Sequence, residues 1–62
     1  MLSQNIKKLR KKHKLSQEQL AQKAGITYST LIKIESGANN NPTIKTVQKI
    51  AKGLDVSLDN LL

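Results

Sequence analysis

The side chains of this 62-residue chain that could do chemistry are cations and hydrogen-bond donors, not nucleophiles beside a base. The sequence has no cysteine and a single histidine, so disulfides, thiolate metal sites and histidine-based metal sites are excluded. No glycine-rich loop that could cradle a phosphate is present. These features indicate a protein that is not an enzyme and carries no metal or cofactor.

Positive charge is concentrated in one segment. Eleven Lys and Arg stand against four Asp and Glu, a formal net charge of +7. Six of the eleven lie in residues 7–14, KKLRKKHK, which contain no acid. A small domain this basic favours a polyanionic partner. Three alternatives remain open from charge: lysines that only keep the protein soluble, a basic face for an acidic protein partner, as in an antitoxin or adaptor, and a basic helix on an anionic membrane.

Aromatic residues, which bind single-stranded nucleic acids by stacking, are almost absent, because Tyr28 is the only one. This composition favours a double-stranded partner. No apolar run approaches the ~20 residues of a membrane span. The basic N-terminal segment also lacks the apolar region of a signal peptide. We therefore expect a cytoplasmic protein without a membrane partner.

Apolar residues recur at helical spacing along the whole chain, and no strand pattern is present. The pattern predicts helices over residues 2–13, 16–23, 28–36 and 43–53, then a short terminal turn capped by Ser57. The expected fold is all-α: one domain, residues 1–62, forming a compact bundle of five short helices. The residues expected to be buried by the fourth helix are Ile44, Val47, Ile50, Ala51 and Leu54.

The ends of the second and third helices carry specific signals. Ser16 and Gln19 have the spacing of a capping box, in which each side chain bonds the other residue's backbone N–H. Thr27 is expected to cap the third helix, and Gly37 to end it.

Only AGIT, residues 24–27, joins the second and third helices, so they must cross steeply, at roughly 90–120°. We expect Ala21 and Ala24 to be small so that these helices can approach each other. We expect Gly25 to supply the positive φ of the turn.

Residues 17–36, QEQLAQKAGITYSTLIKIES, resemble the helix-turn-helix of the phage repressor and Cro family, the lambda repressor-like or XRE-like DNA-binding domains. The family has a small residue at the fifth position of this unit, here Ala21, and glycine at the ninth, here Gly25. Its buried positions match Leu20, Ala24, Ile26, Leu31 and Ile34. The similarity continues through LRKKHKLSQEQLAQKAG, IESG, Pro42, IAKGL and VSLDNLL.

The resemblance implies sequence-specific binding of double-stranded DNA by a prokaryotic or phage-type transcriptional regulator, most simply a repressor, with residues 28–36 in the major groove. The residues it implies at bases are Gln17, Tyr28, Ser29 and Lys33. The residues it implies at phosphates are Thr27, Ser36, Asn39, Asn40, Asn41 and Lys45. A homodimer on a pseudo-palindromic operator is expected. The apolar tail LDNLL either forms the dimer interface or closes the core of the monomer.

The family commonly joins the positions of Arg10 and Glu35 by an ion pair, so the resemblance implies a partly buried pair between the first and third helices. Two features depart from the family. Glycine is common where Asp55 stands, whereas Gly53 lies inside the fourth helix and is expected to loosen its last turn by about 0.5–1 kcal/mol. The loop GANNNP has asparagines where basic residues are common.

Residues 28, 29 and 33 discriminate between the DNA-binding hypothesis and its alternatives. Their side chains are polar, whereas a protein-interaction face more often carries exposed apolar anchors. A membrane-surface helix requires a broader face of bulky apolar residues than residues 2–13 provide.

Overall fold

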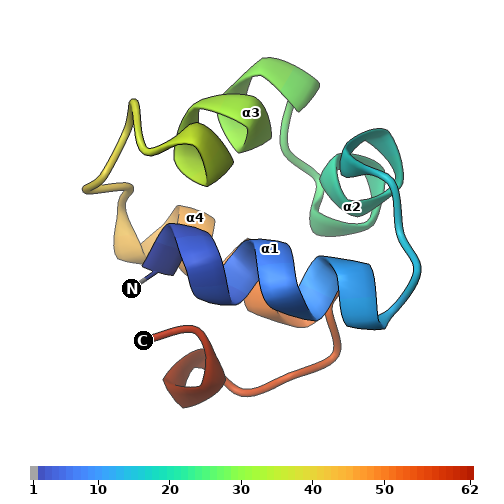
Figure 1. Cartoon of the computed structure of the whole chain (residues 1–62). Helices are drawn as coiled ribbons and strands as arrows, with labels where there is room; N and C mark the ends of the chain where they lie inside the picture. Colours follow the sequence, from blue (N-terminus) through green and yellow to red (C-terminus); the bar gives the residue numbers. More distant parts are fainter. Residues whose placement is uncertain (1) are drawn as a thin grey trace.

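The computed structural model describes residues 2–62, and within that range it contains helices and turns but no strand. The elements are α1 (Leu2–Lys12), α2 (Gln17–Ala24), α3 (Tyr28–Ser36), α4 (Ile44–Gly53) and the 3₁₀-helix η1 (Leu58–Asn60). α1 crosses the front of the molecule in Figure 1, with α3 above it and η1 below. The all-α prediction is therefore confirmed.

The expected fifth helix is only a single 3₁₀ turn. Ser57 occupies the N-cap position of η1 but makes no side-chain capping bond. Its Oγ instead donates to Oδ1 of Asn60, over 3.3 Å. The predicted position of Ser57 at the start of this turn is confirmed, but the expected capping bond is not made, because the hydroxyl has a side-chain acceptor within the same turn.

The other predicted helix signals are present. Ser16 Oγ accepts from the Gln19 N–H over 3.0 Å, and Gln19 Oε1 accepts from the Ser16 N–H over 2.8 Å, so the capping box is complete. Thr27 Oγ1 accepts from the Thr30 N–H over 3.1 Å at the start of α3. Gly37 ends α3 at φ 85°. These local interactions determine where α2 and α3 begin and end.

One apolar core joins all the elements. Its buried residues are Ile6, Leu20, Ala21, Ala24, Leu31, Ile34, Val47, Ile50, Ala51, Leu54 and Leu61. The prediction that Ile44 is buried was wrong, since 58% of this residue is exposed. Ile44 has the same helical spacing as Val47 and Ile50, but it lies in the first turn of α4, which no neighbouring element in residues 2–62 covers.

The C-terminal tail closes the core of the monomer. Leu61 is fully buried, and its carbonyl oxygen accepts a hydrogen bond from Asn5 Nδ2 over 3.0 Å. The start of α1 and the C-terminal end consequently lie on the same side of the molecule (Figure 1). Among residues 2–62, no helix is long and apolar enough to traverse a bilayer. That range also holds no cluster of three His, Cys, Asp or Glu side chains that could bind a metal ion.

Candidate nucleic-acid interface

The turn between α2 and α3 depends on the backbone conformation of Gly25. Its φ is 72° and its ψ is 32°, in the left-handed region, and its N–H bonds the carbonyls of Ala21 and Gln22. A Cβ at this position would meet nothing within 4 Å. Glycine is therefore favoured here for its φ and not for lack of space, as predicted.

Ala24 also lies against α4, a contact that the sequence did not predict. A Cβ built on Gly53 would lie 3.0 Å from N, 3.1 Å from Cα and 3.2 Å from Cβ of Ala24. Ala24 thus makes room for α4 as well as for the turn into α3. Gly53, expected only to loosen α4, is the residue that allows α4 to approach the backbone of α2.

α3 presents a polar face to solvent on the side opposite its buried residues. Ser29 and Lys33 are exposed and lie one helical turn apart, and Tyr28 at the start of α3 is 49% exposed. Leu31 and Ile34 are buried beneath them. The structure therefore brings Tyr28, Ser29 and Lys33 together on one accessible helix surface.

The predicted phosphate contacts Thr27 and Ser36 both use their hydroxyls within the protein. Thr27 Oγ1 bonds Thr30 Oγ1 over 2.7 Å in addition to capping α3. Ser36 Oγ donates to the Lys33 carbonyl over 3.2 Å and accepts from the Ala38 N–H over 3.3 Å. Both residues are exposed, so DNA would meet hydroxyls that are already hydrogen-bonded.

A buried carboxylate supports α3 from behind. Glu35 is 3% exposed, and its Oε2 accepts from Arg10 Nε over 2.8 Å while its Oε1 accepts from Arg10 Nη2 over 3.1 Å. Arg10 Nη1 also donates to the Leu15 carbonyl over 2.8 Å. The predicted ion pair is confirmed, and it joins α1, the α1–α2 connection and α3.

Gln17, the first residue of α2, belongs to the same network. Its Nε2 donates to Glu35 Oε1 over 3.1 Å, and its side chain is half-buried. The sequence pattern did not predict this bond, because residues 17 and 35 are neighbours only once α2 and α3 have crossed. One amide N–H of this predicted base contact is thereby committed to Glu35, which leaves the carbonyl oxygen and the second N–H.

Ile32 is a member of the α3 surface that the sequence analysis missed. It is half-buried and lies one turn from Tyr28 on one side and from Ser36 on the other. The i, i+4 spacing from Tyr28 was the available signal.

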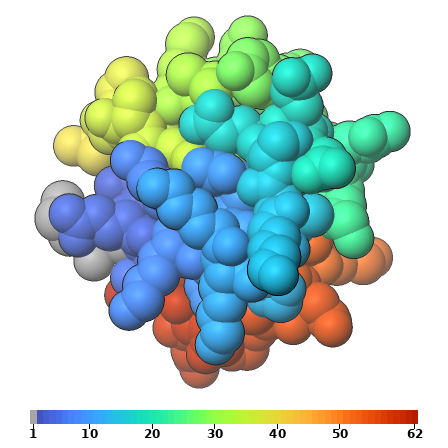
Figure 2. Space-filling view, turned by 45° about the vertical axis from the view of Figure 1, so that its right-hand side comes forward, coloured from blue at the N-terminus to red at the C-terminus, as the bar shows by residue number. Residues whose placement is uncertain are grey.

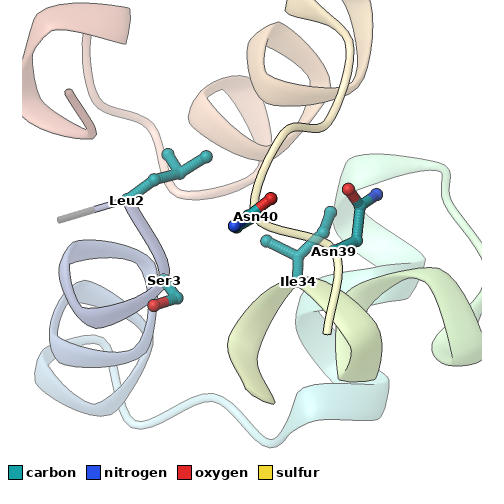
Figure 3. A pocket seen from close by; sticks show the side chains of 5 residues that line it. All are labelled: Leu2, Ser3, Ile34, Asn39 and Asn40. Atoms are coloured by element: carbon teal, nitrogen blue, oxygen red, sulfur yellow. The ribbon is translucent and has the colours of Figure 1, made fainter. Parts of the chain in front are cut away.

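The loop after α3 is held by its own polar groups. The Asn39 N–H donates to the Lys33 carbonyl over 2.9 Å, and Asn39 Oδ1 accepts from the Asn41 N–H over 3.2 Å. The residues Leu2, Ser3, Ile34, Asn39 and Asn40 line a cavity of about 60 Å³, and Figure 3 shows Asn40 on the side of Ile34 toward α1, whereas the Asn39 side chain points away from α1. Asn40, Asn41 and Lys45 are exposed. Asn39 therefore shapes the loop, while these other three remain accessible.

The pairing of α2 and α3 across a short turn, with a polar outer face on the second helix, defines a helix-turn-helix domain. The sequence matches the family model described as "Helix-turn-helix" over residues 6–61, and the chain belongs to that family.

Relatives of known name are regulators of transcription. The chain is 42% identical over 62 residues to the HTH-type transcriptional regulator SinR of Bacillus subtilis, covering all of this chain and 56% of SinR. It is 36% identical over 61 residues to the immunity repressor protein of Bacillus phage phi105, covering 98% of this chain and 42% of that protein. The chain thus spans about half the length of these relatives.

Solved structures agree with this assignment. SinR in complex with DNA matches with a TM-score of 0.93 at 41% identity, covering 98% of this chain and 97% of that one. The restriction-modification controller protein C.AhdI from Aeromonas hydrophila also has a TM-score of 0.93, at 31% identity, covering 98% and 91%.

Proposed function

We propose that this chain binds double-stranded DNA sequence-specifically, as the DNA-binding domain of a prokaryotic transcriptional regulator that acts in the cytoplasm, most simply as a repressor. The observation that carries the proposal is the exposed polar face of α3, held by a turn and a buried network that fix its direction. Its role is binding and not catalysis. The family match and the solved SinR–DNA complex support the proposal.

α3 is the element that enters the major groove in this proposal. Lys33 donates to guanine O6 and N7, and Ser29 bonds any base edge. Tyr28 and Ile32 provide apolar contact for a thymine methyl group. Gln17 reaches the outermost base with the part of its amide that Glu35 does not occupy.

Backbone contacts surround α3. Lys45, Asn40 and Asn41 are exposed on the segment that follows α3 and are assigned to phosphates. Asn39, Thr27 and Ser36 add weaker phosphate contacts, because parts of their polar groups are already bonded within the protein.

One domain offers few base contacts, so the regulator binds as a homodimer to a pseudo-palindrome with half-site centres roughly 10–10.5 bp apart. Leu61 is committed to the core, whereas Leu62 is 66% exposed and Ile44 is 58% exposed. These two exposed apolar residues are the candidates for contact with the second copy.

Selection from random duplex DNA tests this proposal, followed by affinity measurements on the enriched site and on random duplex at one salt concentration. Lys33→Ala should lose about 1–3 kcal/mol on the enriched site and relax preference at one base pair per half-site. Lys49→Ala, an equal charge change at an exposed position of α4, is the control and should not alter preference.

Three results would count against these assignments. If selection enriched no motif, the regulator hypothesis would fail. If Lys33→Ala weakened enriched and random duplex equally, Lys33 would be a phosphate contact. If alanine at residues 28, 29 and 33 had no effect on the enriched site, α3 would not be the reading helix.

A further inference from the structure

A basic groove lies between α1 and η1, outside the DNA interface proposed above. Its volume is about 330 Å³, within the ~300–1,000 Å³ of typical ligand sites. The residues that line it are Asn5, Lys8, Leu9, Lys12 and Asn60. Figures 1 and 2 show η1 below α1 and α3 above it, so the groove is on the side of α1 away from the DNA-reading helix.

The groove has the chemistry of a carboxylate-binding surface. Lys8 and Lys12 are exposed and one helical turn apart, so both ammonium groups can reach the same bound segment. Asn60 Oδ1 accepts from Ser57 Oγ, which leaves its amide nitrogen to donate to a ligand. Half-buried Leu9 supplies an apolar floor. Asp59 of η1 is exposed and is not among the lining residues.

These lysines are placed poorly for the DNA that α3 would bind, because they line the opposite side of α1. We therefore consider an anionic partner other than the DNA bound by α3. A second duplex fits less well, since a protein reads the major groove by inserting a protruding element, and this surface is hollow. A membrane would need bulky apolar groups on the same face. A second copy across a two-fold axis would bring like charges together.

We infer that the groove between α1 and η1 binds an acidic, extended segment of a partner protein, and that it does so while α3 is bound to DNA. Glutamate or aspartate side chains pair with Lys8 and Lys12, and the Asn60 amide donates to the main chain of the segment. The inference goes beyond DNA binding, because it assigns a second interaction surface to the same domain.

Titration of the ¹⁵N-labelled full chain with hexaglutamate, followed by backbone amide shifts, tests the inference at fixed low salt. The shifts should concentrate at residues 5–12 and 58–60. Lys8→Gln with Lys12→Gln should weaken binding at least fivefold. The matched control, Lys49→Gln with Lys52→Gln, removes equal charge from exposed positions of α4 and should change binding less than twofold.

A second arm adds a duplex from the selection experiment. Hexaglutamate should still shift the groove residues when the duplex is bound. Displacement by one equivalent of duplex would overturn the inference, as would equal weakening by the two double variants or shifts spread over every lysine-bearing element. Groove shifts caused by excess duplex or by phosphatidylserine vesicles, without shifts by hexaglutamate, would assign the groove to those partners instead.

Discussion

Glu35 is the residue on which the position of α3 most depends, because of the bonds that its carboxylate accepts. It accepts hydrogen bonds from Arg10 and Gln17, which belong to α1 and α2. Within residues 2–62, no buried side-chain nitrogen or oxygen lacks a partner. Removing one member of this network would leave another uncompensated in a nearly water-free site.

We expect Glu35→Gln and Arg10→Met each to lower the free energy of unfolding by about 3–5 kcal/mol, because each leaves a buried charge without its partner. Urea denaturation measures this loss. The double variant should cost less than the sum of the two, because neither charge then remains. Unchanged denaturation midpoints for both single variants would show that the pair does not stabilise the fold.

Asp55 is a residue whose backbone conformation favours glycine. Its φ is 57°, in the left-handed region. This conformation explains why the family commonly has glycine at this position, where the present chain has Asp55. Asp55→Gly should be more stable than Asp55→Ala by about 1 kcal/mol, since alanine is strained at this φ.

The control for that comparison is Gln48, exposed in the interior of α4. There the order should reverse, with alanine about 1 kcal/mol more stable than glycine. Thermal denaturation of the four variants measures both differences. The same order at the two positions would contradict the role assigned to φ.

At the scale of the helices, the contact between α2 and α4 includes a close backbone approach at Ala24 and Gly53. Gly53→Ala would raise helix propensity by about 1 kcal/mol in an isolated helix. In this protein the new methyl group would meet the Ala24 backbone at 3.0 Å, and backbone atoms cannot move aside as a flexible side chain can. We therefore expect Gly53→Ala to lower the melting temperature. An increase in the melting temperature would mean that α4 moves away from Ala24 without losing stability.

Much of the helix pattern could be predicted because it depends on neighbours in sequence. The Ser16–Gln19 box, the Thr27 cap and the positive φ of Gly25 each follow from a few adjacent residues. Contacts between elements were harder to predict. Ile44 has the period of a buried residue yet is exposed, because burial depends on what lies opposite.

The candidate site divides in the same way. The helical period of α3 suffices to predict that Tyr28, Ser29 and Lys33 share an accessible surface. The bond from Gln17 to Glu35 could not be derived, because it requires the crossing angle of two helices. The family resemblance, and not periodicity, predicted the Arg10–Glu35 pair.

At the scale of the whole molecule, the basic side chains are distributed over more than one face. Binding to DNA should weaken linearly in a log–log plot against salt, with a slope near −0.9 per neutralised phosphate. Lys45→Ala should reduce the slope by about one and weaken all sequences alike. Lys8→Ala should leave the slope unchanged, because Lys8 lines the groove beside η1. Fluorescence anisotropy over a salt series measures these slopes, and a salt-independent affinity would rule out phosphate contacts.

The burial of Leu61 has a consequence for biosynthesis. Its side chain completes the same core as Ile6, and its carbonyl is bonded by Asn5, 56 residues earlier in the chain. A nascent chain on the ribosome can form individual helices as they emerge. It cannot close the core until residue 61 has left the exit tunnel. The domain therefore gains its cooperative stability in a single step, once residue 61 has emerged, and not helix by helix.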